Sequence, residues 1–328
     1  MTCKIAVIGV GVMGSNHARI YQSLPEAELV AVVDSDLTRA RTVAEKHSVP
    51  YYDSVQALLS KNRIDAASVA VPTSLHAIVA EELLSAGVHV LVEKPLAMTV
   101  DECQKLCALS ERLGAIVMVG HVERFNPAVR KLRELIREGK FGDITSIITR
   151  RVGLAPPRIR DTDVVTDLAV HDIDIANFLV GKQPVDVYAN SGYGNLRDRV
   201  DFSEIFLNYG NCNAIISVNW LTPLKIRKMS VTGTQGYAEL DFIRQELLLF
   251  EAPSSNSFDE FSDFIIKYGH DDSRRLPIDF AEPLAAELGY FVHCVQTHAQ
   301  PEVGCREAIA VLSIVKDVLK QNSGNRRI

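Results

Sequence analysis

Residues 5–14 read Ile5-Ala-Val-Ile-Gly9-Val-Gly11-Val-Met-Gly14, an apolar run that leads directly into three glycines spaced G-x-G-x-x-G. The apolar run predicts a buried β-strand, and the glycines predict the turn that joins this strand to a helix. Gly9 permits a tight turn, Gly11 has no Cβ and lets a ligand approach the backbone, and Gly14 lets the helix pack closely on the strand. The spacing therefore indicates the first strand, turn and helix of a dinucleotide-binding unit.

A single acidic residue, Asp34, ends the next apolar run. It follows Gly14 by about 20 residues, the spacing at which a carboxylate accepts hydrogen bonds from the adenosine ribose hydroxyls. A carboxylate repels the 2′-phosphate of NADP, and the next residue is Ser35 instead of an arginine, so the sequence predicts NAD over NADP. Arg39 and Arg41 lie near enough to moderate that preference.

Composition limits the class of protein. The 328 residues are enough for two domains, and a hydrophobic content of 47% supports sizeable cores. A net charge of -6 argues against nucleic acid as a partner. No apolar stretch reaches about 18 residues, and the sequence opens on a strand instead of a signal peptide, so we expect a soluble, cytoplasmic protein that does not engage a membrane. The six cysteines form no C-x-x-C pair, so we expect reduced thiols.

Short β-branched runs alternate with helical patterns in the first part of the chain. After Asp34 we expect helices at 38–47, 55–59, 75–86 and 100–113, and strands at 67–71, 89–92 and 116–119. This alternation predicts an α/β domain over residues 1–121, a Rossmann doubly wound parallel sheet that binds NAD.

Longer extended segments dominate from about residue 144. We expect strands at 144–152, 185–191, 201–209, 213–220, 225–232, 237–242 and 246–250, with one helix at 165–179. Amphipathic helices at 282–298 and 306–320 end the chain. The pattern predicts a second, α+β domain over residues 122–328 with a largely antiparallel open sheet. We expect its C-terminal helices to pack back toward the first domain.

Ligands of an open parallel sheet bind outside the carboxyl ends of its strands. The residues that follow the predicted strands are polar and rich in turn formers, so we expect them to converge on one crevice. These residues are Pro72, Thr73 and His76 after one strand, Glu93, Lys94 and Pro95 after the next, and His121, Arg124 and Asn126 after the third.

Lys94 is the strongest catalytic candidate among them. It follows a buried apolar strand and precedes a proline that rigidifies the turn, which would hold an ammonium near the nicotinamide end of the cofactor. Such a lysine can hydrogen-bond a reacting hydroxyl and share in proton transfer. An isolated lysine at a strand end usually faces solvent, but its neighbours Glu93 and Pro95 favour a functional role here.

Asp167, His171 and Asp174 are spaced i, i+4 and i+7 on the predicted helix of the second domain, so they share one face. A histidine beside carboxylates is a suitable general base, because its neutral ring takes an alcohol proton and a carboxylate stabilises the imidazolium. Two alternatives stay open. The three side chains could form a solvated salt-bridge face, or they could bind a metal, although no further cluster completes a metal site and we expect none.

In this order, the glycine motif, Glu93-Lys94-Pro95 and Asp167-x-x-x-His171-x-x-Asp174 resemble the family of glucose-fructose oxidoreductase, inositol dehydrogenase and rhizopine catabolism proteins (Gfo/Idh/MocA). The resemblance covers nearly the whole chain. It implies an NAD(P)-dependent oxidoreductase in which a Rossmann domain precedes an α/β domain that binds the substrate and whose open sheet mediates homodimers or homotetramers. Ala169 departs from the pattern, because the family usually has glycine there.

The resemblance also implies roles for single residues. Lys94 and His171 would act at the substrate carbinol, with Asp167 and Asp174 near the substrate. The implied cofactor contacts are Gly9, Gly11, Val12, Met13, Gly14, Asp34, Pro72, Thr73, His76, Glu93 and Lys94.

A finer resemblance points to a substrate. Segments 120–127 and 151–160 resemble the subgroup of UDP-N-acetylglucosamine 3-dehydrogenases, which oxidise the sugar 3-hydroxyl to a ketone that a partner sugar aminotransferase can convert to an amine. Guanidinium offers paired N–H groups to phosphate oxygens, so arginines are candidate donors to the diphosphate. The candidate substrate contacts are Asp167, Asp174, His121, Arg124, Asn126, Arg158 and Arg160, although Arg158 and Arg160 could equally be solvated loop charges.

Other functions stay open at this point. The substrate could be an inositol or a free sugar, or the chain could be a redox-neutral NAD-dependent glycosidase of the same superfamily. A non-catalytic NAD sensor is a third class, and the presence of both Lys94 and His171 argues against it.

Overall fold

The computed structural model describes residues 2–155, 162–251 and 274–322. The chain divides into two compact units. The first consists of Met1–Phe125 and Glu282–Ser313, and the second of Asn126–Ala281 and Ile314–Ile328. Most of the second unit is therefore an insertion in the sequence of the first. Across the described ranges, the helices are too short or too polar to cross a lipid bilayer.

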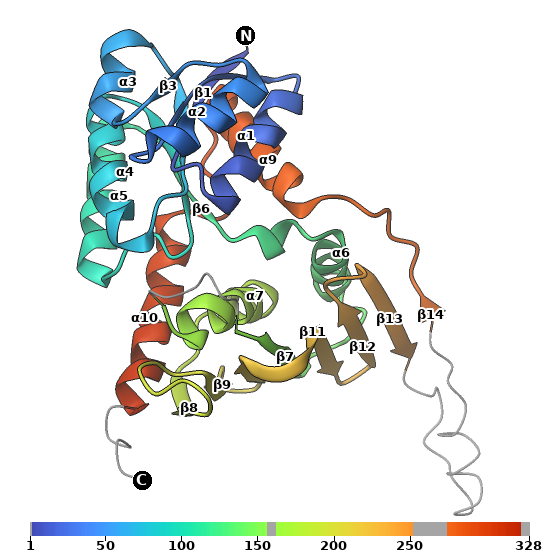
Figure 1. The fold of residues 1–328 in the computed structure, drawn as a ribbon. Helices are drawn as coiled ribbons and strands as arrows, with labels where there is room; N and C mark the ends of the chain where they lie inside the picture. Colours follow the sequence, from blue (N-terminus) through green and yellow to red (C-terminus); the bar gives the residue numbers. More distant parts are fainter. Residues whose placement is uncertain (1, 156–161, 252–273, 323–328) are drawn as a thin grey trace, which may run out of the picture. The chain divides into compact units, whose positions relative to one another are not determined.

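The first unit contains the predicted doubly wound parallel sheet (Figure 1). In the described residues its strand order is β3-β2-β1-β4-β5-β6, and neighbouring strands are parallel. This is the strand order of dinucleotide-binding sheets. The order in which strands are added reverses between β1 and β4, and this reversal leaves a crevice at the carboxyl ends of the two strands. The strands are β1 (Cys3–Ile8), β2 (Ala27–Val33), β3 (Tyr51–Tyr52), β4 (Ala66–Val69), β5 (His89–Glu93) and β6 (Val117–Gly120).

Helices cover both faces of this sheet (Figure 1). One face carries α1 (Val12–Ser23), α2 (Leu37–His47) and α9 (Pro283–Thr297), and the other carries α3 (Val55–Lys61), α4 (His76–Ser85) and α5 (Val100–Leu113). With helices on both sides, strand residues are buried whichever way they point, which explains the continuous apolar runs of the sequence. Val7, Val32 and Val90 are each 0% exposed.

Cys107 of α5 and Cys305, at the start of α10 (Cys305–Asn322), form a disulfide. The expectation of reduced thiols is wrong for this pair. The two cysteines are 198 residues apart in sequence, and they meet because the first unit is built from both ends of the chain. Cys3, Cys103 and Cys212 are free and buried, as is Cys294.

The second unit contains the predicted, largely antiparallel sheet, whose described strands run in the order β14-β13-β12-β11-β7-β10-β9-β8. The pair β10 and β7 is parallel, and the other neighbours are antiparallel. Alternate residues of β9 and β10 are buried, as expected for a sheet with one covered face. The strands are β7 (Ile144–Leu154), β8 (Asp186–Gly192), β9 (Phe202–Asn208), β10 (Asn213–Asn219), β11 (Leu221–Gly233), β12 (Gly236–Asp241), β13 (Glu246–Glu251) and β14 (Arg274–Arg275).

Two helical segments contact the covered face of this sheet. The predicted helix at 165–179 is present as a π-helical turn, η3 (Val165–Ala169), followed by α7 (Val170–Val180). A second helix, α6 (Pro127–Arg137), was not predicted, although the sequence carries its signals. Asn126 caps it by accepting from the backbone N–H of Ala128 at 3.1 Å, and a proline takes its first position.

We predict that Thr99→Ala destabilises the first unit. Thr99 and Glu102 form a capping box at the start of α5, in which Oγ1 of Thr99 accepts from the N–H of Glu102 at 3.2 Å and the Glu102 carboxylate accepts from the N–H of Thr99 at 2.9 Å. Loss of this cap should lower the free energy of unfolding by about 1 kcal/mol. The shift of the urea unfolding midpoint measures this effect.

Thr42→Ala is the matched control. The Thr42 hydroxyl donates to the carbonyl of Thr38 inside α2, so its removal leaves no backbone N–H without its acceptor. An equal loss of stability in both variants would contradict the capping role.

Candidate functional site

The turn after β1 has the backbone conformation that its glycines predict. Gly9 has φ of 83°, and a Cβ at this position would lie 2.7 Å from the carbonyl oxygen of Ala70, just after β4. A Cβ on Gly14 would overlap the carbonyl oxygen of Gly9. Glycine is therefore required at both positions for β1, α1 and the end of β4 to come this close together.

The N-terminus of α1 is open. Gly11 is the N-cap and supplies no side-chain cap, the first turn contains no acidic residue, and a Cβ on Gly11 would meet nothing within 4 Å. Val12 and Met13 are 52% and 39% exposed. Unsatisfied N–H groups and the helix dipole favour an anion at such an end, so these residues fit a pyrophosphate.

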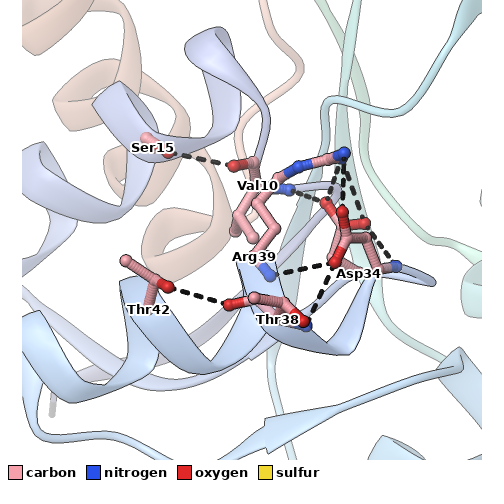
Figure 2. A network of polar contacts seen from close by, with 7 residues as sticks. Val10, Ser15, Asp34, Thr38, Arg39 and Thr42 are labelled. Carbon is pink, nitrogen blue, oxygen red and sulfur yellow. Dashed lines mark hydrogen bonds and ion pairs between the residues drawn. The ribbon is translucent and has the colours of Figure 1, made fainter.

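Asp34 follows β2 beside this turn and is 7% exposed (Figure 2). Its carboxylate accepts from the backbone N–H of Val10 at 3.0 Å and from that of Asp36 at 2.9 Å. Nη1 of Arg39 donates to both carboxylate oxygens, at 3.3 and 3.1 Å. The backbone therefore fixes the acid at the edge of the glycine turn, where the ribose of a dinucleotide would lie.

The two arginines that could moderate the preference for NAD both contact carboxylates. Arg39 bridges Asp34 and Asp36, with 3.1 Å from Nη2 to Asp36. Arg41 pairs with Glu45, 2.7 Å from Nε, on the exposed side of α2. A 2′-phosphate would have to draw these guanidinium groups away from carboxylates that it also repels.

Residues after β4 form a short 3-10 turn, η1 (Thr73–Leu75), that leads into α4. Pro72 is exposed and Thr73 is half-buried, whereas His76 is 1% exposed. The ring nitrogens of His76 face two backbone carbonyl oxygens, that of Pro95 at 2.8 Å from Nδ1 and that of Val71 at 2.9 Å from Nε2. Burial lowers the pKa of His76, while these two carbonyl contacts partly oppose the shift. These contacts connect the start of α4 to the carbonyl groups of Val71 and Pro95, and contact of His76 with the cofactor stays a prediction.

Glu93 ends β5, and Lys94 and Pro95 follow it; Glu93 and Lys94 are half-buried and Pro95 is buried. The Glu93 side chain is 13% exposed, and its Oε1 lies 3.0 Å from Nε2 of His17 on α1. Burial alone would raise the pKa of the Glu93 carboxyl, but the hydrogen bond and charge of His17, together with the charges of Lys94 and His76, outweigh it, so this pKa lies below its ordinary value. Glu93 is therefore an ionised residue turned toward α1 at the base of the Lys94 turn. The sequence alone did not indicate His17.

The residues after β6 mostly make contacts inside their own unit. His121 is 2% exposed and begins the turn η2 (Val122–Phe125). Arg124 is 5% exposed and its Nη1 donates to the carbonyl of Glu302 at 3.1 Å. Asn126 is 1% exposed, caps α6 and donates to the carbonyl of Phe242 at 3.0 Å. Arg124 and Asn126 thus each donate to a backbone carbonyl of their own unit, and their contact with the substrate stays a prediction.

In the second unit, the π-helical turn η3 carries Asp167 and leads into His171 on α7. Asp163 fixes its start, because its Oδ1 accepts from the N–H groups of Val165 and Thr166, both at 2.9 Å. Turns of this kind occur frequently at functional sites. Asp167 and His171 are both half-buried.

Most of α7 is buried. Asp174 is 1% exposed, and Val170 and Ile173 are 2% and 0% exposed. A solvated salt-bridge face is therefore wrong for Asp174. Because a buried carboxylate needs polar partners, Asp174 makes contacts within the protein and does not face solvent.

A buried ion pair lies next to His171 in the sequence. Asp172 accepts from Nε of Arg151 at 2.9 Å, and the two side chains are 1% and 5% exposed. The guanidinium carbon of Arg151 lies 4.9 Å from the ring centroid of Phe242. The pair joins α7 to β7, and removal of one partner would leave a buried charge without compensation. Sequence spacing did not reveal this pair.

Arg158 and Arg160 lie outside the described residues. Among the described candidates of the first unit, the glycine turn, Asp34, the η1 turn and Lys94 all follow the carboxyl ends of neighbouring strands. These residues fit a dinucleotide whose pyrophosphate binds at α1 and whose ribose binds at Asp34.

Two family models match the chain. Residues 3–121 match the model described as an oxidoreductase family with an NAD-binding Rossmann fold, and residues 129–239 match the GFO/IDH/MocA C-terminal domain. Among relatives, the UDP-N-acetylglucosamine 3-dehydrogenase of Acidithiobacillus ferrooxidans is 30% identical over 90% of this chain and 89% of the relative. An inositol 2-dehydrogenase of Rhizobium meliloti is 25% identical over 100% of this chain and 99% of the relative.

Solved structures agree with these matches. A crystal form of the A. ferrooxidans enzyme superposes with a TM-score of 0.85 at 28% identity, covering 97% of both chains. The fold is shared at lower identity with an oxidoreductase from Agrobacterium radiobacter in complex with NAD+, L-tartaric acid and magnesium, with a TM-score of 0.84 at 17% identity over 99% of this chain and 98% of that one. The chain belongs to the Gfo/Idh/MocA family of NAD-binding oxidoreductases.

Proposed function

We propose that the chain oxidises the 3-hydroxyl of UDP-N-acetylglucosamine to a ketone with NAD. The observation that supports this substrate is the similarity to the A. ferrooxidans enzyme, which extends over 90% of the chain and therefore spans both units. A keto product of this kind is a substrate for amine transfer, so a sugar aminotransferase is the proposed partner in the same pathway.

The chain's own residues would divide the chemistry as follows. Bound NAD supplies the acceptor for a hydride from the carbinol carbon. Neutral His171 takes the hydroxyl proton, because an imidazole is a good proton acceptor near neutral pH, and Asp167 and Asp174 stabilise the imidazolium. The Lys94 ammonium donates a hydrogen bond to the same oxygen and holds it in position.

The diphosphate of the substrate needs cationic donors. Arg158 and Arg160 remain the proposed ones, because their guanidinium groups suit phosphate oxygens. Arg124 is a weaker candidate, because its Nη1 already donates to the carbonyl of Glu302.

A second candidate substrate is a cyclic polyol. The similarity to the R. meliloti inositol 2-dehydrogenase is lower in identity but extends over the whole chain. A redox-neutral glycosidase would use the same cofactor without accumulating NADH.

The outward face of the second sheet is the proposed surface for a homodimer or homotetramer. Tyr188, Ile148 and Ile215 are 58%, 46% and 40% exposed on strands β8, β7 and β10. Arg150, with Lys228, Glu239 and Glu246, lines a hollow on β7 and β11–β13, so both signs of charge are available to a second copy. Exposed apolar groups rimmed by charges are typical of protein interfaces.

We predict that NAD and UDP-N-acetylglucosamine together give NADH, measured by its absorbance, with hydroxylamine present to trap the ketone. Lys94→Met should lower kcat by about 10²-fold, because the carbinol oxygen loses the ammonium that holds it in position, and should leave the Kd for NADH within about twofold. Lys61→Met is the control, because Lys61 is exposed on α3 and far in sequence from the motif.

Parallel assays with myo-inositol, free N-acetylglucosamine, UDP and an aryl glycoside separate the candidates. If only myo-inositol gives NADH, the substrate is a polyol and not the nucleotide sugar. Cleavage of the aryl glycoside without accumulation of NADH would indicate the redox-neutral reaction. Unchanged kcat in Lys94→Met would overturn the role of that lysine.

We also predict a preference for NADH over NADPH of at least about tenfold in Kd, measured by fluorescence titration. Asp34→Asn keeps an acceptor for the N–H of Val10 but removes the charge that repels a 2′-phosphate. This variant should bind NADH more weakly and NADPH more strongly than the wild-type protein. Equal affinities of the wild-type protein for both cofactors would contradict the assignment to Asp34.

Finally, Ile148→Glu should shift the protein to a smaller mass in light scattering after gel filtration, because it places a charge on the proposed interface. Ile78→Glu, which alters an exposed isoleucine on α4 of the first unit, is the control. A wild-type protein that is monomeric at micromolar concentration would overturn the interface.

A further inference from the structure

Glu93 immediately precedes Lys94, but its carboxylate is directed to the interior of the first unit. Only 13% of the side chain is exposed, and Oε1 lies 3.0 Å from Nε2 of His17, whose own side chain is 0% exposed. The two residues are 76 positions apart in sequence. Polar groups inside a protein are costly to bury without a hydrogen-bond partner, so each of these side chains stabilises the position of the other.

The direction of this hydrogen bond follows from chemistry. An ionised carboxylate can only accept, so Nε2 of His17 carries the proton and donates it. Bonds from a nitrogen donor to a charged acceptor are stronger than neutral ones, and low local polarity strengthens them further. The bond therefore favours the rotamer of Glu93 that directs its carboxylate toward α1.

A second surface confines the same carboxylate. A Cβ on Gly120, at the end of β6, would lie 3.2 Å from both Oε2 and Cα of Glu93. That spacing is tighter than ordinary van der Waals contact, so the absence of a side chain at Gly120 makes the space that Glu93 occupies. Glu93 is held between α1 on one side and β6 on the other.

The far end of the Lys94 turn is held as well. His76 lies with its Nδ1 2.8 Å from the carbonyl oxygen of Pro95 and its Nε2 2.9 Å from that of Val71. Lys94 is thus the residue between two positions that are each fixed by a buried histidine. The lysine itself is half-buried.

We propose that His17 is a positioning residue for Lys94. His17 acts through Glu93. Because His17 lies on α1, one helical turn after Gly14, its contact with Glu93 connects the helix that would bind the pyrophosphate to the turn that carries Lys94. The inference rests on the proposed function insofar as Lys94 acts on the substrate. If His17 has this role, α1 binds the cofactor at its N-terminus and positions Lys94 from a residue one helical turn further along.

Tyr21 provides a matched control on the same helix. It lies four residues after His17, is 0% exposed and hydrogen-bonds Oγ of Ser68 on β4 at 2.7 Å. The ring of Tyr21 packs edge-on against that of His17, with 6.5 Å between the ring centroids, and phenylalanine keeps this ring while it loses the hydrogen bond to Ser68. Tyr21→Phe therefore measures how a general destabilisation of α1 affects kcat and the labelling of Lys94.

The test compares His17→Leu, His17→Gln and Tyr21→Phe by three measurements. These are the Kd for NADH by fluorescence, kcat with UDP-N-acetylglucosamine, and the acetylation rate of Lys94 by an N-hydroxysuccinimide ester, followed by peptide mass spectrometry with exposed Lys61 as internal reference. A misplaced catalytic group can cost about 10²-fold in rate. We expect His17→Leu to lower kcat by about 10- to 100-fold and to change the Lys94 to Lys61 labelling ratio by at least about threefold, with the NADH Kd within about threefold.

His17→Gln should recover most of both losses, because its amide N–H can donate to Glu93 as the imidazole does. Tyr21→Phe should lower the melting temperature but leave kcat and the labelling ratio unchanged. If His17→Leu does not fold, His17→Asn replaces it, since its shorter amide reaches less far than that of glutamine.

Distinct outcomes separate this inference from the proposed function. An unchanged labelling ratio in His17→Leu, or equal losses of kcat in His17→Leu and Tyr21→Phe, would overturn the positioning role. A wild-type protein that oxidises no sugar, combined with altered Lys94 labelling in His17→Leu, would overturn the substrate and support the positioning role.

Discussion

The first unit depends on the close approach of the turn after β1 to the end of β4. Only a residue without a side chain fits where Gly9 lies against the carbonyl of Ala70, and the same turn leaves no room for a Cβ on Gly14. This contact lies between β1 and β4, where the strand order reverses: β2 and β3 are added on one side of β1, and β4, β5 and β6 on the other. Asp34 on one side and Lys94 on the other then lie on the same edge of the sheet because the strand order leaves them there.

Local patterns were sufficient to predict most of this sheet. Apolar strands, the glycine spacing and the acid after β2 each depend on residues close in sequence. The contacts that escaped prediction join distant positions. His17 and Glu93 meet across 76 residues, and Cys107 and Cys305 across 198. No periodicity encodes such pairs, because they arise only after helices and strands have packed.

In the second unit, a different feature limits what can be predicted from the sequence. Its strands were predicted closely, since one covered face imposes alternation on the sequence. The surroundings of α7 could not be predicted, because burial of Asp172 and Asp174 depends on which elements pack against the helix. Arg151 compensates one of these charges from β7. The helix α6 is not predicted, and its cap, Asn126, is identified from the sequence only as a candidate substrate contact. Capping and binding use the same polar side chains, and the sequence does not distinguish them.

The disulfide between α5 and α10 changes the connectivity of the chain. Oxidation of Cys107 and Cys305 closes a covalent ring, and the inserted segment Asn126–Ala281 lies wholly inside it. A protease that cuts once anywhere within this ring leaves two fragments that stay linked until a reductant is added. The unfolded chain is also more compact when the ring is closed, which lowers its conformational entropy. Both cysteines belong to the first unit, so the bond joins the two sequence segments of that unit across the insertion.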